Sequence, residues 1–272
     1  MISFCLCRNG KKSSFEKFIS YEKGSNFEQF NGTVIGKCTN CELLKTFSSG
    51  SVNKFNPRQS RGEFYDNSEE KFIELFKPIV NLIKKHKKRG IIIDVGCSSG
   101  ILLLLLKEEG FNVMGIEPNK NAFEKARKKL GKKVYHGTLQ RFIKNKRTKF
   151  DCIIYNHVIE HIENPIAEIS LAKKILKKDG LLIVGVPNTD NVIFFLRQKY
   201  WESLMPNEHI WHFSEKYLEN LFNELSFKIV EKIFTDDKRQ DYPLFKRIYF
   251  KILSIFNRIL NTGEAVLFII KK

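Results

Sequence analysis

The 272-residue sequence lacks long hydrophobic runs, and its longest apolar stretch near the middle is ILLLLL at 101–106. This is far short of the about 20 apolar residues that cross a bilayer, so no transmembrane helix is expected. The N-terminus, MISFCLCRNGKK, lacks the apolar core of a secretory leader. These absences predict a cytoplasmic protein whose six cysteines are buried thiols or metal ligands rather than disulfides.

Arginine is scarce although the chain is strongly basic, with 47 Lys and Arg against 30 Asp and Glu and a formal net charge of +17. Such a charge can attract nucleic acid, an anionic membrane surface or an anionic substrate. Most of the excess is lysine, in stretches such as KKHKKR at 84–89 that are typical of solvated helix faces. Because arginine is the residue that clamps phosphates and reads base edges in bidentate fashion, the composition disfavours nucleic acid as the partner.

The chain divides by composition into two regions. Residues 1–50 are rich in Ser, Asn, Gly and Lys and hold four of the six cysteines, so they are predicted to form a small module. The polar stretch 48–64 is interpreted as a linker. Over 66–272, apolar strands alternate with helices, which predicts an α/β domain with a Rossmann-like, seven-stranded, mostly parallel sheet covered on both faces. The long connection between the last two strands predicts an antiparallel edge strand.

The segment IIIDVGCSSG, residues 91–100, places a carboxylate and two glycines at the end of a buried strand. Open parallel sheets bind ligands at this end of their strands. Gly96 and Gly100 let the backbone turn sharply and approach a ligand, and the amides of the next helix N-terminus point toward it. The spacing differs from the G-x-G-x-x-G of nicotinamide sites, and Asp94 would repel a pyrophosphate but attract an ammonium group.

This loop resembles the cofactor loop of class I S-adenosylmethionine-dependent methyltransferases, with Ser98 in place of the middle of three glycines. The resemblance implies that the loop holds the methionine part of the cofactor. Glu117, which ends the second strand, is then expected to accept hydrogen bonds from the ribose hydroxyls. The residues expected to bind the cofactor are Asp94, Gly96, Cys97, Ser98, Gly100, Glu117, Pro118, Leu139, Asn156 and His157.

Two further stretches carry the resemblance. FDCIIYNHVIEHIENP, residues 150–165, is similar to the branch with hydrophobic-x-Glu-His after the fourth strand, which includes ubiquinone-type and sugar-type methyltransferases. KKILKKDGLLIVGVPN, residues 173–188, is similar to the family's helix, glycine turn and fifth strand. The spacing i, i+3, i+4 predicts His157, Glu160 and His161 on one helical face. They could bind a divalent ion, His161 could act as a general base, or Glu160 and His161 could only brace the fold.

A second histidine cluster, NEHIWHFS at 207–214, precedes a helix that is expected to begin at Ser214, a favourable N-cap. A related branch of the family carries a similar H-x-x-H-F-S stretch, where a lid can cover the substrate. Since a histidine of near-neutral pKa suits deprotonation of a hydroxyl, His209 or His212 is a candidate base. The alternative is local packing with Trp211 buried. The candidate catalytic residues are His161, His209, Glu160 and His212.

Four cysteines near the N-terminus could close a tetrahedral zinc site: Cys5, Cys7, Cys38 and Cys41. The resemblance to sugar-modifying methyltransferases with a zinc-ribbon-like module implies structural zinc here. The first half departs from that pattern, because Phe4 occupies the expected first position and Cys5 must extend into the site. The alternative is a module with reduced, buried cysteines. Outside the module, Cys97 and Cys152 are interpreted as small apolar fillers.

The segment 242–260, within a helical insertion expected over 241–262, has its apolar residues on one broad helical stripe. Its opposite face carries Lys246, Arg247, Lys251 and Arg258, and the segment contains no acid after Asp241. The helix could act as a lid, pack against the domain, form a dimer contact or lie on an anionic membrane. Buried stripes are commoner than interfacial ones, which favours a lid or packing.

The resemblance implies that the chain transfers a methyl group from S-adenosylmethionine to a small-molecule acceptor, first of all a hydroxyl of a sugar or polysaccharide precursor. The alternatives are a quinol or lipid-linked acceptor at a membrane surface, a protein or nucleic-acid methyltransferase, and a cofactor-fold protein without activity. The stretch 156–159, NHVI, lacks the Asn-Pro-Pro-aromatic motif of enzymes that methylate base amino groups. A Pro-Cys pair for C5 methylation is also absent.

Overall fold

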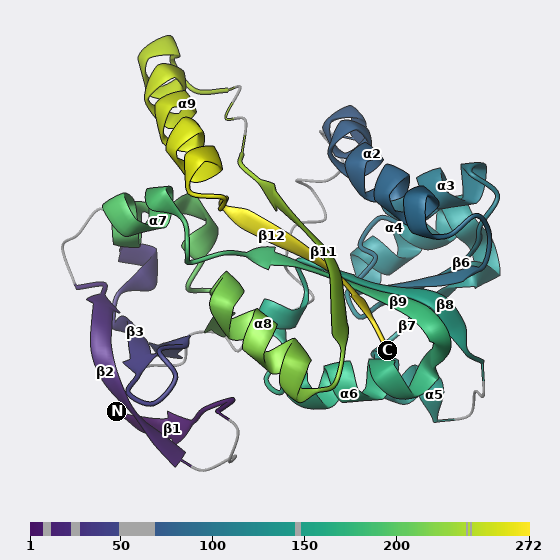
Figure 1. The fold of residues 1–272 in the computed structure, drawn as a ribbon, viewed down its shortest axis with the longest axis horizontal. Coiled ribbons are helices and arrows are strands. Elements are labelled where there is room, and N and C mark those ends of the chain that lie inside the picture. Colours follow the sequence, from purple (N-terminus) through teal and green to yellow (C-terminus); the bar gives the residue numbers. More distant parts are fainter. Residues whose placement is uncertain (8–11, 23–27, 49–68, 145–147, 238, 240) are drawn as a thin grey trace. The chain divides into compact units, whose positions relative to one another are not determined.

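The computed structural model describes residues 1–7, 12–22, 28–48, 69–144, 148–237, 239 and 241–272 (Figure 1). The expected linker, apart from Ser48, lies outside these residues. The chain divides into two compact units. The first comprises Met1–Phe55, Ile159–Ile166 and Gly185–Ile269, and the second comprises Asn56–Val158, Ala167–Val184 and Ile270–Lys272.

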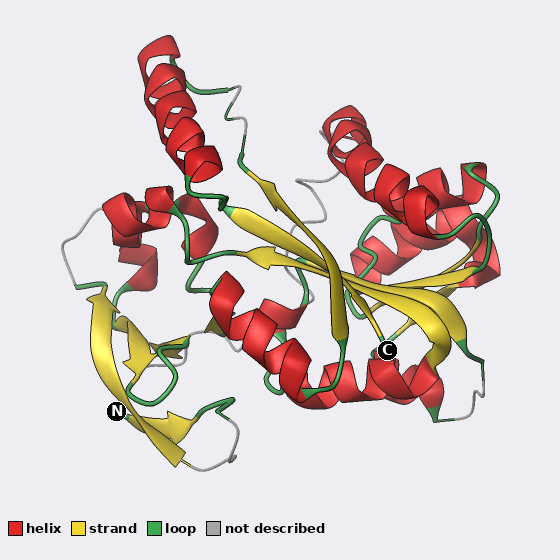
Figure 2. Cartoon of the chain, viewed as in Figure 1, coloured by secondary structure: helices red, strands yellow, loops and turns green. Residues whose placement is uncertain are grey.

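The larger sheet has seven strands in the order β11-β12-β9-β8-β5-β6-β7. Strands are drawn in yellow and helices in red in Figure 2. They are β5 (Ile91–Val95), β6 (Asn112–Glu117), β7 (Val134–His136), β8 (Phe150–Asn156), β9 (Leu176–Pro187), β11 (Lys228–Thr235) and β12 (Ala265–Lys271). β5 pairs in parallel with β6 and β8, and β6 with β7. The last strand, β12, lies inside the sheet between β9 and β11. The expected α/β class with a mostly parallel, Rossmann-like sheet is confirmed.

Helices alternate with these strands, as the sequence pattern predicts. They are α2 (Glu69–His86), α3 (Ile101–Glu108), α4 (Lys120–Leu130), α5 (Leu139–Ile143), α6 (Pro165–Ile175), α7 (Val192–Arg197), α8 (Glu215–Glu224) and α9 (Leu244–Ile259). Ser214 caps α8, since its hydroxyl oxygen accepts a hydrogen bond from the Tyr217 N–H at 3.1 Å. α2 has acids in its first turn and bases in its last, which suits the helix dipole.

Apolar side chains that are buried on both faces of the central strands form the core. In β8 and β9 the consecutive residues Cys152–Tyr155 and Leu181–Pro187 are all buried, which is the pattern of a covered parallel sheet. The parallel register sets Asp94 opposite Gly115 and Val95 opposite Ile116. The carboxyl ends of β5 and β6 therefore lie at the same edge of the sheet, and the loops that follow them meet there.

A smaller antiparallel sheet contains the N-terminal cysteines. Four of its strands follow one another in the sequence: β1 (Ile2–Phe4), β2 (Lys12–Ser20), β3 (Thr33–Cys38) and β4 (Leu44–Ser48). The fifth strand, β10 (Trp211–His212), lies in the stretch NEHIWHFS at 207–214 and pairs with β4. In that pairing Trp211 is opposite Lys45, and His212 is opposite Leu44. The cysteine-bearing sheet is therefore completed by a distant part of the chain, within the first unit.

Helix lengths and polarity also bear on the membrane question. In the part of the chain that the structure describes, no helix is both long enough and apolar enough to cross a bilayer.

Candidate active site

The loop between β5 and α3 turns through three left-handed residues. Gly96, Ser98 and Gly100 have φ angles of 78°, 48° and 79°. A Cβ atom on Gly96 would lie 2.6 Å from Val158 Cγ2, so this glycine is also required for close packing against the turn after β8. Ser98 stands where the family pattern has glycine, and it adopts the left-handed backbone conformation that usually requires glycine.

Glu117 ties the loops after β5 and β6 together. Its Oε2 atom accepts a hydrogen bond from the Ser98 N–H, and its Oε1 atom accepts one from the Asn119 N–H, both at 2.8 Å. The side chain is buried, and burial raises the pKa of its carboxyl. Because each carboxylate oxygen has two lone pairs, Glu117 can accept further donors such as ribose hydroxyls.

Asp94 is the second buried acid at this edge of the sheet. Burial, with a further contribution from the charge of Glu117, raises the pKa of Asp94 to about 8. A carboxyl group in such a site is stabilised in its charged form by a neighbouring cation. The geometry therefore suits an ammonium group, as the sequence predicts for the methionine end of the cofactor.

The remaining candidate cofactor residues end strands of the larger sheet or follow them in the chain. Cys97 is buried, and a Cβ atom on Gly115 would lie 2.7 Å from its Sγ atom, which agrees with its interpretation as a small filler. The Pro118 carbonyl accepts a hydrogen bond from His136 Nε2 at 3.2 Å. Leu139 begins α5 and is fully buried, while Asn156 ends β8. All of the candidate cofactor residues belong to the second unit.

The expectation that His157, Glu160 and His161 share a helical face is wrong. His157 has a φ of 55° and precedes the only helical turn here, the 3₁₀ helix Ile159–His161. Because His157 lies outside the 3₁₀ helix, the spacing of i, i+3, i+4 does not place it on a helical face with Glu160 and His161. His157 is exposed, whereas Glu160 is buried.

A different histidine joins Glu160 and His161. Glu160, His161 and His209, hereafter the histidine cluster, each offer one potential ligand atom, and these atoms lie within 4.8 Å of one another. The His161 and His209 rings meet edge to face with centroids 4.8 Å apart. The Ile210 N–H donates a hydrogen bond to the Glu160 carbonyl at 2.9 Å, which holds the two chain segments together.

A backbone contact decides the tautomer of His161. Its Nδ1 atom lies 2.9 Å from the Glu208 carbonyl oxygen. Because a carbonyl only accepts, Nδ1 carries the proton and donates it, and the lone pair of the neutral ring lies on Nε2. A ring oriented in this way can act as a base or as a metal ligand through Nε2. A partner that is a main-chain carbonyl leaves no signal in the sequence.

His212 is placed in a different environment. It is buried, and burial lowers its pKa to about 3, although the charge of Glu160 acts in the opposite direction. Its Nε2 atom lies 2.8 Å from the Thr46 Oγ1 atom in β4. A group with so low a pKa is a weak base at neutral pH, so the contact supports a bracing role. No motif in the sequence indicates Thr46.

Trp211 is buried, as the packing alternative expected. Its Nε1–H donates to the Ile162 carbonyl at 3.1 Å, and Lys45 Nζ lies 4.6 Å from the centroid of its ring. Trp211, which stands between His209 and His212 in the sequence, is therefore used for packing. His209, by contrast, belongs to the histidine cluster.

The four N-terminal cysteines converge on one point in the first unit. Cys7 Sγ lies 3.1 Å from both Cys5 Sγ and Cys41 Sγ and 3.5 Å from Cys38 Sγ. A tetrahedral zinc ion with bonds of about 2.3 Å places its sulfur ligands about 3.8 Å apart, so a small expansion of this cluster accommodates the ion. Hydrogen bonding from Cys5 lowers the pKa of Cys41 to about 5 and raises that of Cys5. Cys5 thus reaches the cluster although Phe4 occupies the expected position.

Comparison with known proteins gives a consistent result. A family described as a methyltransferase domain matches residues 68–232. The ubiquinone biosynthesis O-methyltransferase of Actinobacillus pleuropneumoniae is 30% identical over 135 residues, which cover 45% of this chain and 58% of that protein. The chain therefore spans less than two thirds of that relative.

Solved structures share the fold. An S-adenosylmethionine-dependent methyltransferase from Archaeoglobus fulgidus has a TM-score of 0.57 and 22% identity, covering 77% of this chain and 100% of that one. A Thermotoga maritima methyltransferase, described as a possible histamine N-methyltransferase, has a TM-score of 0.56 and 21% identity, with coverages of 81% and 100%. At these identities the likeness shows the fold alone.

Proposed function

The chain belongs to the class I S-adenosylmethionine-dependent methyltransferases, and on that premise we propose that it methylates a hydroxyl group of a small-molecule acceptor. Methyl transfer from the sulfonium is an in-line displacement that breaks the S–CH₃ bond and forms an O–CH₃ bond. A hydroxyl acceptor must also lose its proton. The protein therefore has to supply a base or a cation in addition to the cofactor site.

The convergence of Glu160, His161 and His209 is the observation that carries this proposal. His161 Nε2 accepts the hydroxyl proton, because its Nδ1–H is already directed to the Glu208 carbonyl. The buried carboxylate of Glu160 would stabilise the resulting imidazolium. The same three residues could instead hold a divalent cation that lowers the pKa of the hydroxyl, and the experiment below separates these two mechanisms.

In the cofactor site, Asp94 receives the ammonium group and Glu117 receives the ribose hydroxyls. The buried position of both carboxylates and the left-handed turns of the loop support these roles. Cys97, Ser98, Pro118, Leu139, Asn156 and His157 would line the rest of the site by resemblance to the family.

The four cysteines would hold a structural zinc ion in an all-sulfur site. Four thiol groups within 4.8 Å of one another form the ligand set that zinc prefers. The ion would fix the small antiparallel sheet, which consists of β1–β4 and β10, by binding the four cysteines at one point. It would take no part in methyl transfer.

Two acceptor classes are favoured by different observations. The cysteine-bearing module supports a sugar or polysaccharide precursor, because such modules precede the core in sugar-modifying relatives. The 30% identity to a ubiquinone biosynthesis O-methyltransferase supports a quinol or phenol acceptor instead. Both classes present a hydroxyl, so both are compatible with a histidine base.

An acceptor panel with a histidine variant tests the proposal. The purified chain is supplied with S-adenosylmethionine and with phenols, catechols or nucleotide sugars, and methylated products are identified by mass spectrometry. For an active acceptor, His161→Gln is expected to lower kcat by about 10²- to 10⁴-fold with the Kd for the cofactor unchanged. His86→Gln, in the last turn of α2, is the matched control and should retain wild-type kcat.

Three results would contradict parts of the proposal. Wild-type kcat in His161→Gln would remove His161 as the base. Loss of activity on chelation, restored by Mg²⁺ or Mn²⁺, would assign the cluster to a cation. Methylation of an amine in preference to every hydroxyl of the panel would overturn the acceptor class.

A further inference from the structure

Helix α9 exposes a broad apolar face to solvent. Its exposed apolar residues are Leu244, Phe245, Ile248, Tyr249, Ile252, Ile255, Phe256, Ile259 and Leu260. Phe245 and Ile259 are 69% and 71% exposed. At about 3.6 residues per turn, these nine positions fill one continuous arc of about 160°. We call this set the α9 arc. Large exposed patches of this kind mark interaction sites rather than ordinary surface.

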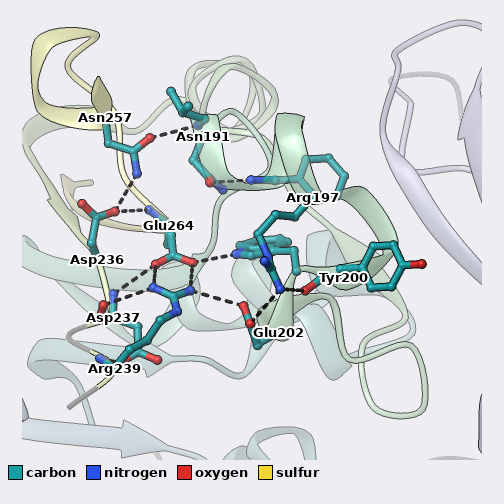
Figure 3. A network of polar contacts seen from close by, with 12 residues as sticks. Asn191, Arg197, Tyr200, Glu202, Asp236, Asp237, Arg239, Asn257 and Glu264 are labelled. Atoms are coloured by element: carbon teal, nitrogen blue, oxygen red, sulfur yellow. Dashed lines mark hydrogen bonds and ion pairs between the residues drawn. The ribbon is translucent and has the colours of Figure 1, made fainter. Parts of the chain in front are cut away.

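The opposite face of α9 attaches the helix to the first unit. Phe250, Leu253 and Asn257 are its buried residues. Asn257 Oδ1 accepts a hydrogen bond from the Val192 N–H at 2.9 Å, and its Nδ2 donates to Asp236 Oδ1 at 2.7 Å (Figure 3). Among the apolar residues of 244–260 only Phe250 and Leu253 are buried, so the expectation that the apolar stripe packs against the domain is wrong for most of its length. The three buried residues on the narrow inner face attach α9 to the rest of the first unit.

A buried ion pair reinforces this attachment. Arg239 Nη1 donates to Glu264 Oε2 at 2.7 Å, and Trp201 Nε1 donates to Glu264 Oε1 at 2.8 Å (Figure 3). The Arg239 guanidinium also lies 3.9 Å from the centroid of the Phe250 ring, on the inner face of α9. The α9 arc takes no part in these contacts, so it is not needed to hold the helix in place.

Basic side chains follow one edge of the α9 arc. Arg247, Lys251 and Arg258 are exposed, and their spacing of four and seven residues places them in a row along the helix. The helix contains no Asp or Glu. An anionic surface complements this edge, whereas a second copy of the helix would bring like charges together. The net charge of +17 acts in the same direction at longer range.

We propose that α9 is a docking surface for an anionic lipid bilayer. The α9 arc enters the boundary between headgroups and acyl chains, and the basic row contacts the headgroups. This proposal goes beyond the proposed methyl transfer and does not depend on the acceptor. It implies that the enzyme works at a membrane surface whether its acceptor is lipid-linked or water-soluble.

Vesicle flotation with the full chain tests the proposal. Wild-type protein should float with vesicles that contain phosphatidylglycerol and much less with pure phosphatidylcholine, and salt should weaken binding. Ile248→Glu/Ile255→Glu is expected to lower the partition coefficient by at least about ten-fold, because charges enter the apolar arc. Leu75→Glu, at a residue of α2 that is 58% exposed, is the matched control and should bind like the wild type.

A fluorescence measurement supplies an independent readout. In Phe245→Trp, emission should shift to shorter wavelength when anionic vesicles are added, since the indole leaves water. An unchanged far-UV circular dichroism spectrum and an unchanged urea-denaturation midpoint show that the variants remain folded. Absence of wild-type binding, or equal binding by Ile248→Glu/Ile255→Glu, would overturn the proposal. It would also be overturned if that variant converted a dimer to a monomer while the wild-type protein ignored vesicles.

Discussion

His212 Nε2 lies 2.8 Å from Thr46 Oγ1, and this contact joins the segment that carries His209 to the cysteine-bearing sheet. The strand pairing of β10 with β4 makes the same connection through the backbone. The candidate cofactor residues, by contrast, all belong to the second unit. Disturbing the cysteine cluster should therefore affect acceptor chemistry and cofactor binding to different extents.

Loss of the cysteine cluster should reduce methyl transfer while cofactor binding persists. Cys38→Ser/Cys41→Ser removes half of the thiolate ligands, so bound zinc should be lost and the sheet that holds β10 should loosen. We expect kcat to fall at least about ten-fold, with the Kd for S-adenosylmethionine changed less than about two-fold. Metal analysis, an activity assay and calorimetry measure the three quantities.

Cys152→Ala is the control, because Cys152 lies buried in β8 outside the cluster and the change should leave the metal content intact. A metal-free double variant with wild-type turnover would show that the sheet does not need the ion.

Cofactor affinity should rise with pH up to about 8. The Asp94 carboxyl has a pKa of about 8 because it is buried, so at pH 6 it is mostly protonated. The ammonium group of the cofactor stabilises the carboxylate, and binding at pH 6 to 7 therefore releases a proton. Affinity should increase by at most about ten-fold per pH unit below 8 and level off above. Calorimetry in buffers of different ionisation enthalpy measures this proton release.

The same shift has a defined effect on stability without cofactor. The folded-state pKa lies above the unfolded value of 3.8, so ionised Asp94 destabilises the fold. The contribution of Asp94 to the free energy of unfolding should decline as pH rises from about 4 to about 8 and then stay constant. Asp94→Asn should remove the Asp94 part of both pH dependences and leave only the part that comes from other buried acids such as Glu117. A variant whose pH dependences matched those of the wild type would identify another group as their source.

Glu117 should be essential for cofactor binding. Glu117→Ala removes the expected ribose acceptor and leaves the N–H groups of Ser98 and Asn119 without the carboxylate that now accepts their hydrogen bonds. Charged hydrogen bonds of this kind contribute about 1.5 to 3 kcal/mol each, so we expect Kd to rise at least about 100-fold. Calorimetric titration measures the change.

Glu117→Gln should fall between the wild type and Glu117→Ala, because the amide keeps one accepting oxygen. Glu124→Gln, an exposed change in α4, should bind the cofactor normally. Equal affinities for all of these proteins would exclude Glu117 from the site.

Breaking the Arg239–Glu264 pair should destabilise the first unit strongly. Both side chains are buried, so Arg239→Met leaves a carboxylate without its main cation in the interior. The expected loss in free energy of unfolding is about 3 to 5 kcal/mol, measured by urea denaturation. Arg239→Met/Glu264→Gln should lose less than the sum of the two single variants.

An exposed ion pair supplies the comparison. Lys77→Met disrupts the contact of Lys77 with Glu74, and both of these side chains are more than half exposed. Its effect should stay within about 1 kcal/mol. Similar losses in Lys77→Met and Arg239→Met would mean that burial adds nothing to the network of Figure 3.

Much of the fold followed from local pattern. The strands 91–95, 112–117 and 150–156 were predictable because runs of apolar residues between turn signals indicate covered parallel strands. Ser214 was predictable as a cap because an N-cap depends on neighbouring residues alone. Asp94 and Glu117 were expected at one edge of the sheet because parallel strands end on the same side, and the structure places their loops together.

The candidate catalytic groups were predictable as residue types but not as a set. His157 follows the spacing of a helical face, yet it has a left-handed φ and lies outside the helical turn that holds Glu160. His209 replaces it because the chain returns to Glu160 from a distant segment. Such a return depends on packing over many residues, and hydrophobic periodicity within a short window does not record it.

By itself, the sequence determined the mostly parallel α/β sheet, the candidate cofactor loop with its two acids and the four N-terminal cysteines as candidate zinc ligands, because these features depend on local pattern or residue type. Only the tertiary structure decided that Trp211 and His212 complete the cysteine-bearing sheet, that His161 presents Nε2, and that α9 attaches by its narrow face. The sequence pattern of an apolar helical stripe is the same whether the folded protein covers the stripe or exposes it. What lies against it depends on contacts between distant parts of the chain, and these form only when the whole chain folds.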